Sequence, residues 1–269
     1  MDRRVTPPSY PDLMALDLPR TLSPSKVVAF TNCPLAFRYS QIEHLPEPPS
    51  PHAVKGTLVH AALEGLFWHH SPGARTPAAA QAELARCWDD LQSDEEYAEL
   101  ALGPDEADAF LTDAGTLVDN YFRLEDPNEA RAVGIELGVE TVVDGMRLRG
   151  IIDRLDVTPD GDLIVVDYKT GRAPSERFER GSMGGVQTYA LLCESLLGRA
   201  PAEVRLLYLR QPVAISSVPS EQTIRGQRRR AVAVWSAIER ACDAEDFRPH
   251  VSPLCNHCHF KTTCPAFAA

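Results

Sequence analysis

The chain has no long apolar run and no excess of basic residues. No apolar segment of its 269 residues approaches the roughly 18 residues that cross a bilayer, and the basic residues at the N-terminus are not followed by the apolar stretch of a signal peptide. We therefore expect a soluble, cytoplasmic protein with no membrane partner. Lysine and arginine number 27 against 38 acidic residues, a net charge of -11, so any polyanion must bind through a local basic patch or a bound metal ion.

A disulfide framework is not expected, because the seven cysteines are an odd number and a reducing cytosol would keep them as thiols. Four of them have a spacing typical of metal ligands, namely Cys33, Cys255, Cys258 and Cys264. A centre bound by these thiols would link the two ends of the chain. An iron–sulfur cluster and a zinc ion both fit, because His257 and His259 lie among the thiols and zinc accepts both residue types. The remaining alternative is that the cysteines are unrelated and buried.

Composition and length indicate one large globular domain. Apolar residues make up 44% of the chain and charged residues 24%, close to globular averages; we expect an irregular, proline-rich arm over 1–20 and a single domain over 21–269. Helices are predicted from Ser23-Pro24 onward, between 77 and 123 (two or three), and over 56–69, 181–197 and 224–241. Strands are predicted over 135–143, 146–157, 163–168 and 204–209. The first three form a meander, and a crossover makes the fourth parallel to its neighbour.

Two aspartates are expected to face each other on the second and third predicted strands. If the turn between them is centred on Asp160, residues whose numbers sum to about 320 are opposite, so Asp153 faces Asp167. Like charges on facing residues, with Cβ atoms roughly 4.5–5.5 Å apart, destabilise a sheet. Alternation puts Asp153 on the face of Ile151 and Asp167 on that of Val165, which predicts that both acids are at least half buried. A divalent cation bound between them would remove the repulsion.

Lys169 follows Asp167 by two residues and points to the same face. Its ammonium could orient or deprotonate a water molecule, or stabilise charge on a phosphate. The alternative is that these are solvated residues near a turn, since a register shift of one residue would separate the acids. Two acids and a lysine on apolar strands favour the metal site. On the helix 56–69, His60 lies one turn from Glu64, and this spacing alone indicates an ordinary surface or core histidine.

Taken together, these motifs resemble those of RecB-like nucleases of the PD-(D/E)XK superfamily. The likeness is strongest to the iron–sulfur branch, which includes AddB-type and CRISPR-associated exonucleases, and it runs from residue 22 to residue 264. The motifs are, in chain order, Ser23-Pro-Ser25 with Cys33-Pro-Leu-Ala-Phe-Arg38, Gly56-Thr-Leu-Val-His60, Gly150-Ile-Ile-Asp153-Arg154, Asp167-Tyr168-Lys169-Thr170-Gly171 and the terminal cysteines. Each is modest by itself, but their joint occurrence in this order is specific.

The resemblance implies an α/β fold with a restriction-endonuclease-like core, in which helices flank a central mixed sheet. It adds a helical insertion over 75–130 and a cysteine-rich tail over 250–269. The implied catalytic residues are Asp153, Asp167 and Lys169, and the implied ligands of Mg²⁺ or Mn²⁺ are His60, Asp153, Asp167 and the backbone carbonyl of Tyr168. The resemblance also implies a [4Fe–4S] cluster that staples the C-terminus, held by Cys33, Cys255, Cys258 and Cys264.

One departure from the family lies on the helix after the Asp-x-Lys strand. Family members commonly carry glutamine four residues before a tyrosine, on one helical face. Here Gly185 occupies that position, and Gln187 precedes Tyr189 by two residues, which do not share a face. Gln187, Tyr189 and Arg154 are the candidates for substrate positioning. Two basic runs are candidate DNA contacts, namely Arg172, Arg177 and Arg180, and Arg225, Arg228, Arg229 and Arg230.

The implied function is a metal-dependent DNA nuclease, an exonuclease on single-stranded DNA or DNA ends, in repair, recombination or CRISPR adaptation. No helicase motif is present in the sequence, so a helicase or CRISPR adaptation proteins are the candidate protein partners. The alternative is a catalytically weak, nucleic-acid-binding iron–sulfur module of a repair or CRISPR complex. The departure at Gly185 favours the alternative, whereas the intact set of Asp153, Asp167 and Lys169 favours the nuclease.

Overall fold

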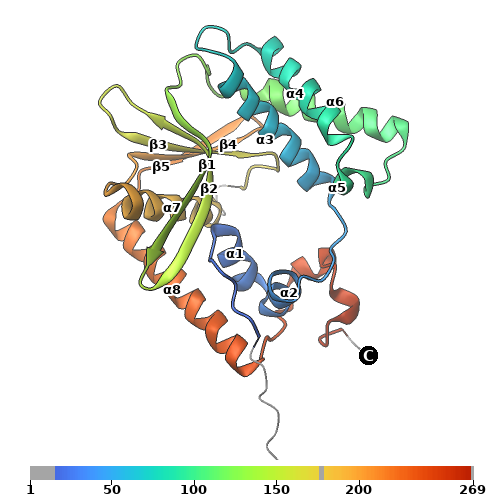
Figure 1. Ribbon diagram of the computed structural model, residues 1–269, viewed down its shortest axis with the longest axis vertical. Coiled ribbons are helices and arrows are strands. Elements are labelled where there is room, and N and C mark those ends of the chain that lie inside the picture. The colour runs from blue at the N-terminus through green and yellow to red at the C-terminus, as the bar shows by residue number, and fades with distance from the viewer. Residues whose placement is uncertain (1–15, 176–178, 268–269) are drawn as a thin grey trace, which may run out of the picture.

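A five-stranded mixed sheet forms the centre of the molecule (Figure 1). The structure is a computed structural model that describes residues 16–175 and 179–267. The strands lie in the order β1 Ala132–Val143, β2 Met146–Val157, β3 Leu163–Lys169, β4 Glu203–Tyr208 and β5 Val213–Ser217. β3 and β4 are parallel, and the other neighbouring pairs are antiparallel. The predicted mixed sheet, meander and parallel crossover are confirmed. The predicted arm over 1–20 lies mostly outside the described residues.

Helices cover both faces of the sheet (Figure 1). One face carries α1 Pro24–Asn32, α7 Glu179–Leu197 and α8 Glu221–Ala244, and the other carries α3 Pro51–His69, α4 Pro77–Leu91 and α6 Pro104–Tyr121. The shorter elements are α2 Pro34–Phe37, the π-helical η1 Arg38–Ile42, α5 Glu95–Ala98, and the 3₁₀ turns η3 Pro253–His257 and η4 Lys261–Thr263. Within the described part of the chain, no helix combines the length and apolar character that a bilayer span requires.

The helices begin where capping chemistry allows. The Ser23 hydroxyl accepts a hydrogen bond from the backbone N of Lys26 at 3.2 Å, and Pro24 occupies the first turn of α1, as predicted. The helix predicted over 56–69 begins earlier, at Pro51, because proline is well tolerated at the first helical position, where no intrahelical N–H bond is needed. The segment between 77 and 123 forms the helices α4, α5 and α6, as expected.

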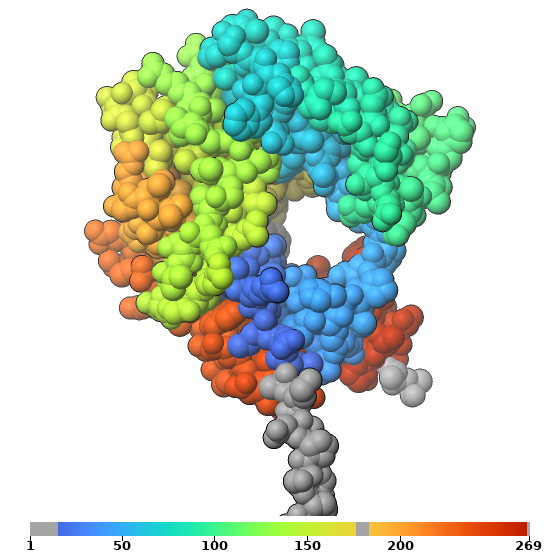
Figure 2. Space-filling view, in the orientation of Figure 1, coloured from blue at the N-terminus to red at the C-terminus, as the bar shows by residue number. Residues whose placement is uncertain are grey.

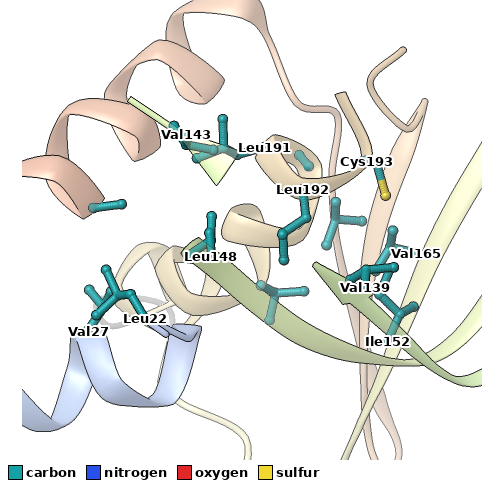
Figure 3. Close-up of a cluster of buried hydrophobic side chains, with 14 of the residues drawn as sticks. Leu22, Val27, Val139, Val143, Leu148, Ile152, Val165, Leu191, Leu192 and Cys193 are labelled. Carbon is teal, nitrogen blue, oxygen red and sulfur yellow. The ribbon is translucent and has the colours of Figure 1, made fainter. Parts of the chain in front are cut away.

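The sheet separates two hydrophobic clusters. Ile152, Val165 and Leu191 belong to the cluster between the sheet and α1, α7 and α8 (Figure 3), and Val166 belongs to the cluster between the sheet and α3, α4 and α6. Each such buried aliphatic side chain contributes roughly 1.5–3 kcal/mol. Because consecutive residues of β3 face opposite clusters, a register shift of one residue would move each side chain into the cluster on the other face. The side chains at positions 167 and 168 therefore leave the sheet on opposite sides.

β2 and β3 pair in the predicted register. Arg154 is opposite Val166 and Asp156 is opposite Ile164, so paired residue numbers sum to 320, and the same register continued by one residue places position 153 opposite position 167. The edge strand β5 was not predicted. It has five residues, pairs only with β4, and exposes 42% of Val213, so its sequence carries little of the buried alternation by which strands are found.

The alternation of β1 and β2 reverses beside Asp153. Leu137 belongs to the cluster between the sheet and α1, α7 and α8. Ile135, two residues away, belongs to the cluster between the sheet and α3, α4 and α6. Between them Glu136 has a left-handed backbone with φ of 44°, which is uncommon for a residue with a side chain. The expectation that Asp153 shares a buried row with Ile151 is therefore wrong, since Ile151 is 45% exposed and Asp153 is 9% exposed. Asp153 is buried because the strand pair is irregular at this point.

Candidate metal and catalytic centre

Donor atoms from α3, β1 and β2 converge on one point. His60 Nδ1 lies 3.6 Å from Asp153 Oδ2 and 3.6 Å from Glu136 Oε1, and ligand atoms of the three residues all lie within 4.8 Å of one another. An edge-to-face contact with Tyr168, with ring centroids 5.8 Å apart, packs against the imidazole. One imidazole nitrogen and two carboxylate oxygens are donors that divalent ions accept. The structure thus brings together His60 and Asp153, which the sequence singled out separately.

Asp167 adds a second aspartate from the end of β3. Its side chain is buried, with 4% exposure. Asp153 Oδ2 accepts a hydrogen bond from the backbone N of Tyr168 at 2.7 Å, which holds the Asp153 carboxylate next to Asp167. Asp167 Oδ2 lies 2.5 Å from Lys169 Nζ, so the ammonium offsets part of the negative charge of the two aspartates. Carboxylate oxygens are donors that divalent cations prefer, so Asp167 adds another candidate ligand beside the three converging groups.

The electrostatics of the site also favour a cation. Burial raises the pKa of Asp153 to about 7, and the negative charge of Asp167 acts in the same direction. Burial lowers the pKa of His60, but the hydrogen bond to Glu136 and the charge of Asp153 outweigh it, so this pKa is raised as well. Without metal, these groups therefore retain protons that ordinary side chains would release. A bound dication would favour the carboxylate and the neutral imidazole.

Lys169 is a cation at neutral pH. Burial lowers the pKa of its ammonium, but the charge of Asp167 outweighs this effect and Asp153 adds to it, so the pKa lies above its ordinary value. The side chain remains 42% exposed, so a substrate can reach it. Because a protonated ammonium cannot accept a proton, the geometry disfavours Lys169 as the base that deprotonates water. Lys169 can still orient a water molecule and stabilise negative charge.

Glu136 is the site residue that sequence reasoning missed. In the β1–β2 pair, Ile135 is opposite Arg154 and Leu137 is opposite Ile152, which leaves Glu136 opposite Asp153. The signal was available, since the turn at positions 144 and 145 sets this register from the sequence alone. Facing acids on adjacent strands repel each other, so the argument applied to positions 153 and 167 applies equally to positions 136 and 153.

Tyr189 is the residue of α7 that approaches the acids. Burial raises the pKa of its phenol, and the charges of Asp167 and Asp153 raise it further. Its ring lies against Gly150 of β2, where an added Cβ would come within 2.8 Å of a ring carbon. Only glycine permits this approach, so Gly150 lets the ring pack against the strand that carries Asp153.

Gln187 contacts α8 through a hydrogen bond, accepted by its Oε1 from Nε2 of Gln227 at 3.2 Å. This follows from its place two residues before Tyr189, on a different face of α7. The geometry does not support the expectation that Gln187 positions the substrate beside Tyr189. At Gly185, the position of the family glutamine, an added Cβ would meet no atom within 4 Å.

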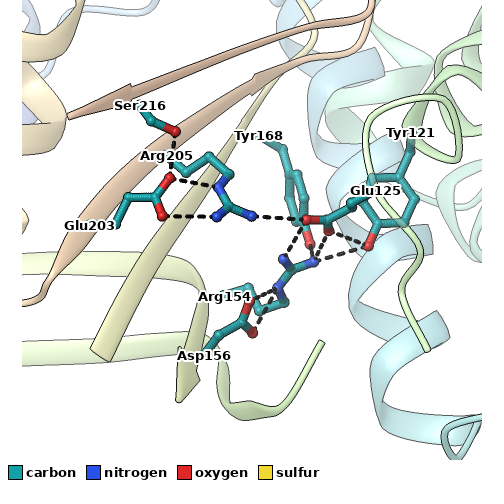
Figure 4. Close-up of polar contacts among 8 residues, drawn as sticks. All are labelled: Tyr121, Glu125, Arg154, Asp156, Tyr168, Glu203, Arg205 and Ser216. Carbon is teal, nitrogen blue, oxygen red and sulfur yellow. Dashed lines mark hydrogen bonds and ion pairs between the residues drawn. The ribbon is translucent and has the colours of Figure 1, made fainter. Parts of the chain in front are cut away.

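Arg154 follows Asp153 on β2 and is fully buried, with 0% exposure (Figure 4). Its guanidinium pairs with Glu125 at 2.5 Å and Asp156 at 2.9 Å and donates to the hydroxyls of Tyr121 and Tyr168, each at 2.9 Å. Substrate therefore cannot touch Arg154, and positioning of substrate by direct contact with this residue is not supported. Two carboxylates and two hydroxyls satisfy a charge that would otherwise be costly to bury. The network ties β2 to β3 and to the end of α6.

The four cysteines of the sequence motif meet at a second centre. They line one small cavity between the N-terminal helices and the C-terminal tail, which lie side by side (Figure 1): Cys33, Cys255, Cys258 and Cys264. The backbone N of His250 donates to Cys33 Sγ at 3.4 Å, and that of Ser252 donates to Cys255 Sγ at 3.4 Å. Hydrogen bonds from backbone N–H groups to ligand sulfurs tune metal centres, so the donor set fits a thiolate-bound group.

The arginines of the two predicted basic runs have different surroundings. On α8, Arg225 pairs with Glu221 at 3.0 Å and Arg228 pairs with Asp144 at 3.6 Å; these are surface pairs of little energetic weight. Arg172 lines a pocket near the end of β3. The side chains of Arg177 and Arg180 lie outside the described part of the structure.

The chain is similar to two phage proteins and to a solved structure. It is 24% identical over 271 residues to the Gene 69 protein of Mycobacterium phage D29, covering 91% of this chain and 96% of that protein. It is 29% identical over 151 residues to the Gene 69 protein of Mycobacterium phage L5, covering 55% of this chain and 48% of that protein. The crystal structure of a protein named "Putative exonuclease" from Eubacterium rectale shares the fold, with a TM-score of 0.60, 12% identity, and coverage of 89% of this chain and 87% of that one.

The sequence profile of the PD-(D/E)XK nuclease superfamily matches residues 21–265. This span contains the whole sheet and the converging groups of His60, Glu136, Asp153 and Asp167 with Lys169. It confirms the superfamily that the motifs resemble. The chain belongs to the PD-(D/E)XK nuclease superfamily.

Proposed function

We propose that the protein is a metal-dependent deoxyribonuclease that hydrolyses phosphodiester bonds as an exonuclease on single-stranded DNA or DNA ends. The observation that carries the proposal is the convergence of His60, Glu136 and Asp153, with Asp167 and Lys169 beside them, in a chain of the nuclease superfamily. Carboxylates buried this close together are expected to share a divalent ion.

Each converging residue has a role in this proposal. His60, Asp153, Asp167 and the carbonyl of Tyr168 would hold Mg²⁺ or Mn²⁺, and Glu136 is an added ligand. When bound, the ion supplies a water of lowered pKa and neutralises charge on the phosphate. Lys169 donates a hydrogen bond to the attacking water or to a phosphate oxygen on which charge develops.

An opening through the molecule supports a single-stranded substrate. Figure 2 shows it between α1 and α2 on the lower side, α3 above, and the β1–β2 pair beside it. α3 carries His60 and β2 carries Asp153, so elements that build the centre also border the opening. A single strand that enters the opening by its free end would run along these elements, which favours cleavage from ends.

Linear and circular single strands test the proposal. With Mn²⁺ we expect the wild-type protein to degrade an end-labelled linear strand, to spare a closed circle of the same sequence, and to stop when EDTA removes the metal. The ratio of the two rates is the measurement. Cleavage of the circle as fast as the linear strand would contradict exonuclease action, and intact linear strands with both Mn²⁺ and Mg²⁺ would contradict the nuclease.

The second candidate function is a catalytically weak, nucleic-acid-binding module of a repair or CRISPR complex. The open space at Gly185 and the engagement of Gln187 with Gln227 favour it, because no glutamine accompanies Tyr189 at the acids. In the same assay this function gives binding of the strand without cleavage. In either case a helicase or CRISPR adaptation proteins are the partners we propose to supply the DNA ends.

We propose that the second centre binds a [4Fe–4S] cluster, which would place the chain in the iron–sulfur branch of the family. Four cysteine thiolates are the usual ligands of such a cluster, and the four cysteines that line the cavity would supply them. Zinc, which also accepts the neighbouring His257 and His259, is the alternative, and metal analysis of the purified protein separates the two.

Metal binding should depend on pH through Asp153. Because the pKa of Asp153 is raised to about 7 and the ion binds the carboxylate form, Mn²⁺ affinity should rise with pH through about 7 and then level off. The metal-free protein should behave oppositely: the native state binds more protons than the unfolded state below this pKa, so its stability falls as pH rises through about 7. Calorimetric titration and thermal unfolding at several pH values check both, and Mn²⁺ affinity that is constant from pH 6 to pH 8 would contradict the first.

A further inference from the structure

We propose that a basic pocket beside the metal centre binds a second phosphate of the DNA strand, an inference that rests on the proposed nuclease function. The pocket has a volume of 390 Å³ and lies among the start of α3, α6, and the residues after β3 and β4. Its charged or titratable lining residues are His52, Lys55, Arg172 and Arg210, and no acid is among its described lining residues. The chain as a whole has a net charge of -11. A local excess of positive charge in such an acidic chain suggests that the pocket binds an anion.

One carboxylate behind the pocket holds two of these cations. Asp113 Oδ2 lies 2.6 Å from Lys55 Nζ and 2.7 Å from Arg210. A single negative charge fixes the geometry of both side chains but neutralises only one, and Arg172 has no ion pair with any described residue. Lys55 and Arg210 each keep further N–H donors. The pocket is therefore a preorganised, net positive site, in which an anion replaces the missing negative charge.

The pocket adjoins the acids through two elements. Thr170 follows Lys169 directly in the chain, and Lys55 precedes His60 by five residues of α3, about 7.5 Å along the helix axis. Gly56 permits the close approach of these elements, since an added Cβ would lie 3.3 Å from Thr170 Oγ1. A strand with one phosphate at the metal centre would therefore carry its neighbouring phosphates within reach of the pocket.

Phosphate is the anion that this chemistry selects. Arginine binds phosphate oxygens through paired charge-assisted hydrogen bonds and lysine binds them as a point charge. Such contacts position a strand without reading its sequence, as a general exonuclease requires. An internal phosphate and a terminal phosphate offer the same chemistry. If the pocket takes a terminal phosphate, it also sets the polarity of the enzyme.

Strand binding in EDTA, where hydrolysis does not occur, tests the pocket. Fluorescent oligothymidines with a 5′-phosphate, with a 3′-phosphate and with neither are titrated at several salt concentrations. We expect the double variant R172Q/R210Q to bind at least about tenfold more weakly and to lower the salt slope by about 1. The matched control R147Q/R248Q also removes two positive charges, both from exposed ion pairs outside the pocket, and should change affinity less than twofold. Equal loss for the three strands identifies an internal phosphate, and loss confined to one phosphorylated strand identifies that end.

This experiment can contradict the pocket proposal and the nuclease proposal independently. If R172Q/R210Q and the control R147Q/R248Q bind all strands alike, with the same salt slope, the pocket proposal is overturned even when the wild type degrades DNA with Mn²⁺. If the double variant loses affinity but the wild type cleaves nothing, the nuclease is overturned and the phosphate site stands. Should the double variant not fold, R172Q alone serves, because Arg172 is exposed and its replacement leaves the Asp113 pairs intact.

Discussion

The Asp167→Asn variant is expected to hydrolyse single-stranded DNA with Mn²⁺ at least about 10³-fold more slowly than the wild type. The amide removes the negative charge of a group that is 4% exposed and leaves Lys169 without its carboxylate partner. A 10³-fold loss corresponds to about 4 kcal/mol, within the several kcal/mol that a metal ion contributes to such reactions. Single-turnover digestion of an end-labelled strand measures the rate, and calorimetry measures the accompanying loss of Mn²⁺ affinity.

The fold of this variant should survive. Without metal, the substitution removes one of two like charges, Asp153 and Asp167, so the melting temperature of the metal-free protein should stay equal or rise. The matched control is Asp160→Asn, which removes an exposed carboxylate from the turn of the same hairpin and should retain full activity. A folded Asp167→Asn protein that cleaves at the wild-type rate would exclude the proposed centre, and equal losses in both variants would point to a non-specific charge effect.

The hairpin could be predicted because its signals are local. Turn residues determine the register of β2 and β3, and this register places Asp153 opposite Asp167. The helices were predictable for a similar reason, since apolar periodicity and caps act within a few turns. His60 was different: its spacing on α3 is that of an ordinary helical histidine, and only the packing of α3 against β1 brings it to the acids.

Three features depended on packing that local patterns do not encode. The left-handed backbone at Glu136 reverses which face of the strand is buried, and a strict alternation of two cannot express such a reversal. Arg154 is hydrophilic by type, yet Glu125 from beyond α6, a distant segment of the chain, makes its complete burial tolerable. Gln187 and Tyr189 were correctly separated by helical geometry, but which of them faces the acids follows from the approach of Tyr189 to Gly150.

The Cys258→Ala variant is expected to lose the proposed cluster and about 5 kcal/mol of unfolding free energy. A shared centre closes a loop of about 220 residues between Cys33 and the C-terminal thiols. A covalent cross-link over a loop of that length reduces the entropy of the unfolded chain by an amount worth about 5 kcal/mol, and metal-bound thiols constrain the chain in the same way. Iron and acid-labile sulfide analysis, visible absorbance and denaturant unfolding of anaerobically purified protein measure the loss.

The matched control for this variant is Cys242→Ala, which removes a thiol from α8 that is 1% exposed and outside the cavity. Its cost is that of a small buried side chain, roughly 1 kcal/mol, with iron content unchanged. Equal destabilisation in the two variants would show that the four thiols hold no common group. A large loss in Cys258→Ala alone, with zinc and no iron in the wild type, would keep the cross-link and reject the iron–sulfur cluster. Because the unfolded chain gains the same entropy whichever group is lost, only metal analysis separates these two cofactors.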